Sequence, residues 1–184
     1  MENADVNQKP GMFKPALNYA VIISALLIII TLLFYLFGDL QSEWASWTGF
    51  VVFLAGVIYS VLSFRNEKSG GYISYGNVVG FSTLIGLFTG VITGLFAFIL
   101  YGFIAPDLME QLRQETIAAT ENLMLQTDPN ISDSELDTMV NMQLRFLNPP
   151  MMMVRAIFGY LIQAVLIGLV AGIFVKKSNP DEIA

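Results

Sequence analysis

Long apolar segments without charge constrain this chain more than any other feature of its sequence. No Asp, Glu, Lys or Arg stands between Lys68 and Asp107. A helix needs about 20 apolar residues to cross the roughly 30 Å hydrocarbon core of a bilayer. The sequence therefore predicts an all-α integral membrane protein with four transmembrane helices. These spans are expected at about 16–38, 44–64, 78–105 and 151–175.

The composition agrees with a membrane protein and removes several kinds of chemistry. Apolar residues make up 55% of the 184 residues and charged residues only 13%, about half the charged share of a soluble domain. The chain contains neither His nor Cys. It therefore lacks the commonest ligands of zinc, copper and haem, as well as all thiol chemistry and disulfides. We expect no metal, no cofactor and no catalytic residue.

The positions of Lys and Arg predict the orientation of the spans, because cytoplasmic loops carry an excess of these residues. The side opposite to the termini has only three arginines, spread over a long segment. We therefore expect a cytoplasmic N-terminal tail (1–15), a single membrane domain (16–177) and a cytoplasmic C-terminal tail (178–184). The cations assigned to the cytoplasmic side are Lys9, Lys14, Arg65, Lys68, Lys176 and Lys177.

The segment 106–150 carries the acidity of the protein. It holds eight carboxylates against two arginines, and its net charge of −6 equals that of the whole chain. Pro106 is typical of a first helical turn, and Ser132 followed by Glu135 predicts a capping box at the start of a second helix. We expect an extracytoplasmic amphipathic helical hairpin between the third and fourth spans. It is either a solvated link, which we favour, or a surface that binds a partner or a cation.

Small residues recur every fourth position in two of the predicted spans. This spacing places them on one helix face, where backbones can approach closely. We expect close helix contacts there, with packing inside the chain favoured over dimerisation. The positions are Gly86, Gly90 and Gly94 in the third span and Ala164, Gly168 and Gly172 in the fourth.

Charged side chains are almost absent from the predicted spans. Arg155 stands about one turn inside the fourth span, where a long side chain can reach the headgroups. We expect an interfacial anchor there, with a contact to substrate or lipid phosphate as the less favoured reading. Neither side of the membrane offers the basic and aromatic surface that nucleic acids require, so no nucleic-acid partner is expected.

The connector between the second and third spans (residues 65–76) is the most distinctive stretch. Its glycines Gly70 and Gly71 permit a sharp turn, and Ser74 and Gly76 complete the motif Gly-Gly-Tyr-Ile-Ser-Tyr-Gly. It lacks the residue order of a phosphate-binding loop, and no strand precedes it.

This motif, followed by a glycine-rich span, resembles a bacterial inner-membrane family catalogued as domain of unknown function 4199. The resemblance extends from about Ala16 to Lys177 and includes Asn148-Pro149-Pro150 before the last span and Lys176-Lys177 after it. It implies four spans, a charged helical excursion and a location in the bacterial inner membrane. It implies no activity, ligand or catalytic residue.

We expect a non-enzymatic scaffold or accessory protein whose partners are the lipid bilayer and a membrane protein or a second copy of the chain. The alternative is a small-solute or lipid transporter that acts as an oligomer. A transporter needs a polar path through the spans. The candidates for that path are Thr83, Thr89, Thr93, Tyr160 and Gln163.

Overall fold

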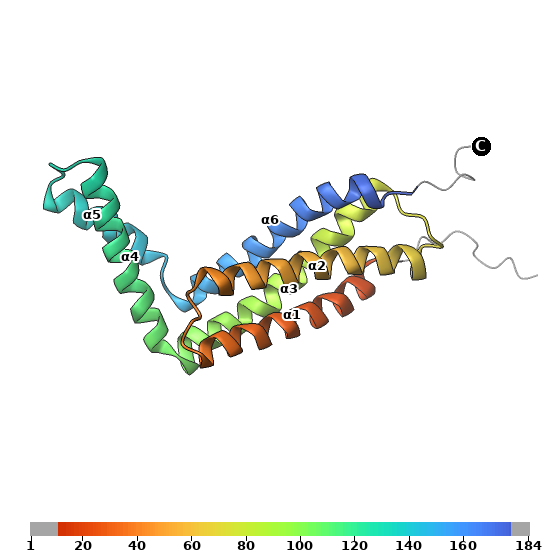
Figure 1. The fold of residues 1–184 in the computed structure, drawn as a ribbon, viewed down its shortest axis with the longest axis horizontal. Coiled ribbons are helices and arrows are strands. Elements are labelled where there is room, and N and C mark those ends of the chain that lie inside the picture. Colours follow the sequence, from red (N-terminus) through yellow and green to blue (C-terminus); the bar gives the residue numbers. More distant parts are fainter. Residues whose placement is uncertain (1–10, 178–184) are drawn as a thin grey trace, which may run out of the picture. The chain divides into compact units, whose positions relative to one another are not determined.

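The computed structural model describes residues 11–177. Most of the predicted tail 1–15 and all of the tail 178–184 lie outside the described residues. Regular structure in the described range is helical (Figure 1). The helices are α1 (Phe13–Leu36), α2 (Glu43–Lys68), α3 (Tyr75–Ile99), the π-helix η1 (Leu100–Ile104), α4 (Pro106–Thr127), α5 (Asp133–Arg145) and α6 (Pro149–Val175).

Four of these helices are long and apolar enough to cross a membrane: α1, α2, α3 continued by η1, and α6. They coincide with the predicted segments, which confirms the all-helical class and the four apolar helices. The third begins at Tyr75 instead of near residue 78. Ser74 explains this earlier start, because its Oγ accepts a hydrogen bond from the backbone N–H of Asn77 at 3.3 Å and so satisfies an otherwise unpaired donor of the first turn.

The third apolar helix ends in a π-helical turn. The N–H of Ala105 donates to the carbonyl of Leu100 at 2.8 Å, and the Ala105 backbone lies outside the helical region at φ −139° and ψ 66°. Pro106 follows, and its ring disfavours the α conformation in the residue before it. Pro106 then opens α4, as the sequence predicts.

The turn between α2 and α3 depends on two glycines. Gly70 and Gly71 have positive φ values of 62° and 86°, a conformation that costs a residue with a Cβ much more than it costs glycine. The Gly71 N–H donates to the carbonyl of Arg65 at 2.9 Å, which closes the end of α2. The predicted sharp turn is therefore confirmed.

The chain divides into two compact units. Unit 1 comprises the described residues up to Thr93 and from Ile157 onward, and unit 2 comprises Gly94–Ala156. Helices α3 and α6 each contribute one part of their length to each unit. The single membrane domain over 16–177 stays a prediction.

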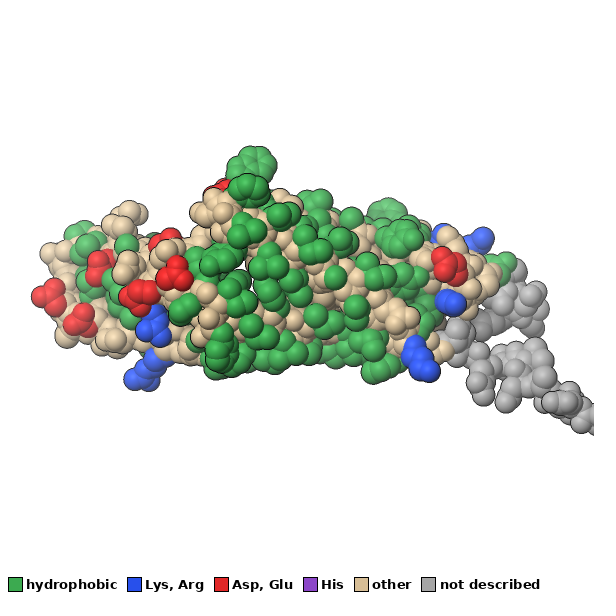
Figure 2. Space-filling model, turned by 90° about the horizontal axis from the view of Figure 1, so that it is seen from below, with side chains coloured by type: hydrophobic (Ala, Val, Ile, Leu, Met, Phe, Trp, Pro, Cys, Tyr) green, Lys and Arg blue, Asp and Glu red, His purple; other side chains and the backbone are tan. Residues whose placement is uncertain are grey.

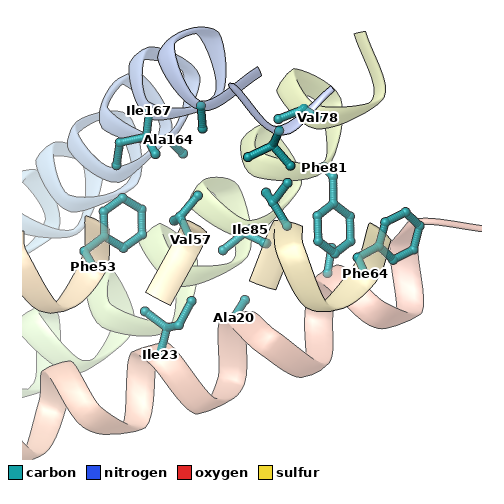
Figure 3. Packing of buried hydrophobic residues seen from close by; sticks show 14 of the residues in the cluster. Ala20, Ile23, Phe53, Val57, Phe64, Val78, Phe81, Ile85, Ala164 and Ile167 are labelled. Atoms are coloured by element: carbon teal, nitrogen blue, oxygen red, sulfur yellow. The ribbon is translucent and has the colours of Figure 1, made fainter. Parts of the chain in front are cut away.

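Unit 1 is a bundle of α1, α2 and the parts of α3 and α6 that belong to it (Figure 1). Side chains from all four helices meet in one buried apolar cluster, among them Ile23, Phe53, Ile85 and Ile167 (Figure 3). The rings of Phe64 and Phe81 stack with centroids 4.3 Å apart. Because lipid tails are as apolar as these side chains, dispersion between well-packed atoms, rather than exclusion of water, holds such an interior together.

The outer surface of unit 1 is apolar as well. Figure 2 shows hydrophobic side chains over most of the visible face of the bundle. A solvated protein rarely exposes so continuous an apolar surface, which fits contact with lipid. On α6 the exposed positions recur mostly at helical spacing: Phe158, Ile162, Leu166, Leu169, Val170, Ile173 and Phe174.

Unit 2 contains the helices of the acidic segment, α4 and α5, which pack on each other. The turn between them is held by Asp128, whose Oδ1 accepts from the Asn130 N–H at 3.0 Å. The predicted capping box is confirmed: Ser132 Oγ accepts from the Glu135 N–H at 3.4 Å, and the Glu135 carboxylate accepts from the Ser132 N–H at 3.2 Å. Two backbone donors of the first turn of α5 are thereby satisfied.

Candidate functional site

Helices α3 and α6 approach each other at the predicted small residues. A Cβ on Gly86 would overlap the Cβ of Ala164 and would lie 2.6 Å from the carbonyl oxygen of Tyr160. No side-chain carbon fits such a space unless the backbones separate. Gly86 and Ala164 therefore set the distance between the two helices at this level of unit 1.

The same contact continues along unit 1. A Cβ on Gly168 would lie 3.0 Å from Cβ of Ser82, and a Cβ on Gly172 would lie 2.8 Å from the ring of Tyr75. The Tyr75 hydroxyl donates to the carbonyl of Leu169 at 3.2 Å. The side chains of Ser82 and Tyr75 on α3 thus pack against Gly168 and Gly172 of α6.

The predicted small residues of α3 also include Gly90 and Gly94, which follow Gly86 along the helix. Gly90 is buried in unit 1. In unit 2, a Cβ on Gly94 would lie 2.9 Å from the carbonyl oxygen of Met153. Of the predicted small residues, Gly86 and Ala164 thus contact each other directly, whereas Gly94, Gly168 and Gly172 each contact other residues of the opposite helix.

The polar side chains of the spans mostly bond within their own helix. Thr83 Oγ1 donates to the Val79 carbonyl at 2.8 Å, and Thr93 Oγ1 donates to the Thr89 carbonyl at 2.7 Å. Such bonds satisfy a hydroxyl in an apolar interior without a partner helix or a water. They leave these hydroxyls directed at the backbone and not at a path between helices.

Two further members of the predicted path, Tyr160 and Gln163, lie on α6. Tyr160 packs its ring against Phe53, with centroids 4.9 Å apart, and Gln163 is half-buried. Three buried hydroxyls have no hydrogen-bond partner among the described residues: those of Ser24, Ser82 and Thr89.

The connector contacts the end of α6. Ile73 and Lys177 exchange both backbone hydrogen bonds, each with an N···O distance of 3.0 Å. Arg65 Nη1 donates to the carbonyl of Val175 at 3.2 Å, and the Lys177 ammonium lies 5.3 Å from the centre of the Tyr72 ring. The bond from Arg65 satisfies a carbonyl that the end of α6 leaves unpaired.

A polar chain links α1 to α2 near the same end of unit 1. The Tyr19 hydroxyl donates to Ser63 Oγ at 2.7 Å, and Ser63 Oγ donates to a Glu67 carboxylate oxygen at 2.7 Å. Lys and Arg side chains gather where α2 and α6 end (Figure 2). Of the six cations assigned to the cytoplasm, Lys9 lies outside the described residues.

The contacts of Arg65, Tyr72 and Ile73 with the end of α6 were not predicted. The connector motif drew attention to Gly70, Gly71, Ser74 and Gly76, which shape the turn and the start of α3. No local pattern identifies a partner that lies about a hundred residues further along the chain.

In unit 2, Arg155 is exposed on α6, as an interfacial anchor requires. Hydrogen bonds from the side chain of Ser132, and then from its backbone N–H, hold the pKa of the Glu135 carboxyl below its ordinary value. In residues 11–177, no group of three or more Asp and Glu side chains is arranged to hold a metal ion.

The chain matches a known protein family. A family model described as Protein of unknown function (DUF4199) matches residues 18–177. No curated protein and no solved structure matches the chain.

Proposed function

The chain belongs to the DUF4199 family of proteins of unknown function, and from this premise we propose that it is a non-enzymatic scaffold or accessory subunit of the bacterial inner membrane. In this proposal both termini are cytoplasmic, and α4 and α5 form an extracytoplasmic hairpin. The partner is another membrane protein or a second copy of the chain, which contacts the apolar outer surface of unit 1.

The observation that carries this proposal is the way in which α3 and α6 pack. Gly86 lies directly against Ala164, and the interior beside this contact is filled by apolar side chains such as Phe53 and Ile85. A transporter that alternates between two states needs a polar site near the middle of the membrane. Hydroxyls bonded to their own helix, as those of Thr83 and Thr93 are, support a static role instead. Against this count stand the buried hydroxyls of Ser24, Ser82 and Thr89, which have no hydrogen-bond partner among the described residues.

In-membrane photo-crosslinking tests the scaffold role. A photoreactive residue replaces Ile162, which is 57% exposed on α6, and in the matched control it replaces Ile167, which is 7% exposed on the same helix. We expect the probe at Ile162 to give a discrete protein adduct, identified by mass spectrometry, and the probe at Ile167 to give crosslinks within the chain only.

Purification in a mild detergent complements this test. A scaffold co-purifies with its crosslinked partner in a fixed ratio. If Ile162 gives lipid adducts alone and a small solute or lipid co-purifies stoichiometrically, the scaffold proposal is wrong and the oligomeric transporter is favoured.

A further inference from the structure

An open cavity of about 580 Å³ lies between α4 and α5 in unit 2. Both arginines of the acidic segment 106–150 line it, and none of the eight carboxylates of that segment does. The cavity lies where α4 and α5 pack on each other, so that Arg113 of α4 and Arg145 of α5 both line it. The lining residues are Arg113, Thr138, Asn141, Met142, Leu144 and Arg145.

Four of the six side chains that line this cavity carry hydrogen-bond donors: Arg113, Thr138, Asn141 and Arg145. Arg113 Nη2 donates to the carbonyl of Leu147 at 3.3 Å, which ties the guanidinium to the segment that leads into α6. A guanidinium carries five N–H donors, so further donors remain for a ligand. Together with Arg145 and the carboxamide of Asn141, they match the oxygens of a phosphate group, which arginine binds through two parallel hydrogen bonds.

We propose that this cavity binds the phosphate group of an anionic phospholipid. A phosphate can also come from free inorganic phosphate in solution, so the choice of a lipid needs its own arguments. Three observations on unit 2 favour the lipid.

The first observation is the position of the cavity along the chain. Only Phe146, Leu147 and Asn148 separate Arg145 from Pro149, the first residue of the membrane-length helix α6. An extended chain of this length spans at most about 14 Å. Arg145 therefore lies within reach of the polar headgroup layer that flanks the hydrocarbon core.

The second observation is the apolar surface beside the arginines. Met142 lines the cavity and is 56% exposed, as is Phe146, which directly follows Arg145. Inorganic phosphate has no apolar atoms, so exposed apolar side chains do not contribute to its binding. A phospholipid places its glycerol and acyl carbons next to its phosphate, so apolar side chains beside the arginines favour it.

The third observation is the net charge of −6 on segment 106–150. This charge repels a soluble anion over about a Debye length and lowers its concentration near the cavity. The same charge also repels an anionic headgroup, but a lipid in the same membrane is held at a high local concentration, which offsets this repulsion. The inference depends on the membrane position of α6 and not on the scaffold role.

Titration of the purified full-length chain in a phosphate-free nonionic detergent tests the proposal. The probes are short-chain phosphatidylglycerol, short-chain phosphatidylcholine and inorganic phosphate, with bound ligand counted by native mass spectrometry. We expect phosphatidylglycerol to bind most tightly. Replacing Arg113→Gln or Arg145→Gln should weaken its binding about tenfold each, because each removes a charge-assisted hydrogen bond.

The matched control for each single variant is Lys68→Gln, which removes the same one positive charge outside the acidic segment. It should bind phosphatidylglycerol as the unaltered chain does. Arg113→Lys with Arg145→Lys keeps the charge but loses the planar fork, and should give an intermediate affinity. This lysine variant keeps the test decisive if the glutamine variants do not fold.

Three results would overturn the proposal. Equal affinity for phosphatidylglycerol in the arginine variants and the unaltered chain would show that the cavity does not hold the lipid. Inorganic phosphate that binds as tightly as phosphatidylglycerol would make this a site for a free anion. Phosphatidylcholine that binds as tightly would remove the requirement for an anionic lipid.

Discussion

Gly86 of α3 lies so close to Ala164 of α6 that a methyl group on Gly86 would overlap the Ala164 side chain. This contact brings two backbones together in a bundle whose outer surface is as apolar as its interior. Since burial from water contributes little between helices in lipid, the closeness of such contacts decides how firmly the helices associate.

We expect Gly86→Ala to lower the free energy of unfolding by about 1–3 kcal/mol, because the added methyl group forces α3 and α6 apart. Unfolding of the purified protein in increasing SDS, followed by circular dichroism, measures this change. The control is Gly80→Ala in the same helix, where a Cβ meets nothing within 4 Å. It should leave stability unchanged or raise it by up to about 1 kcal/mol. Equal losses in both variants would contradict the packing role of Gly86.

Arg65→Gln should loosen the contact between the connector and the end of α6. The variant removes the hydrogen bond from the guanidinium to the Val175 carbonyl, and we expect the Lys177 amide, which is bonded to Ile73, to exchange its hydrogen roughly tenfold faster. Hydrogen exchange followed by mass spectrometry measures the exchange rate of this amide. Lys68→Gln, at the last residue of α2, is the control that should leave the exchange unchanged. An unaltered rate in Arg65→Gln would show that the backbone pairing alone holds this end.

A pair of single cysteines tests the proposed orientation, because the chain has no cysteine of its own. Asn66→Cys lies in the connector and Asn130→Cys lies in the turn between α4 and α5, and both positions are exposed. We expect an impermeant thiol reagent to label Cys at position 130 in intact cells and position 66 only after the cells are broken. The reverse pattern would place the termini outside the cytoplasm.

The start of α5 should depend on pH through Glu135. Because the hydrogen bonds from Ser132 lower the pKa of this carboxyl below its ordinary value of 4.5, they stabilise the helix fully above that ordinary value. The stabilisation is lost as the pH falls through the lowered pKa. We expect amide protection in the first turn of α5 to decrease between neutral pH and about pH 3.

The variant Ser132→Ala separates this effect from general acid unfolding. It removes the side-chain hydrogen bond to Glu135, so it should weaken protection at neutral pH and flatten the pH dependence of α5. A variant that keeps the full pH dependence would show that other carboxylates are responsible.

Features that depend on neighbours along the chain could be read from the sequence. The four apolar helices follow from the length of uncharged segments, and the start of α5 follows from Ser132 and Glu135 only three positions apart. The earlier start of α3 at Tyr75 was missed, although the cap at Ser74 is also local. The π-helical end before Pro106 was missed as well, because the sequence shows where a proline ends a helix and not how the last turn adjusts to it.

The sequence by itself determined the helical class, the apolar segments, the acidic segment between them and the small residues at every fourth position. Only the tertiary structure decided which residues meet. Gly86 packs directly against Ala164. Ile73 forms backbone hydrogen bonds with Lys177. Arg113 and Arg145 line the same cavity. Periodicity and caps arise from bonds within one helical turn, whereas these pairs depend on how whole helices pack, and packing is set by the fit of many side chains at once.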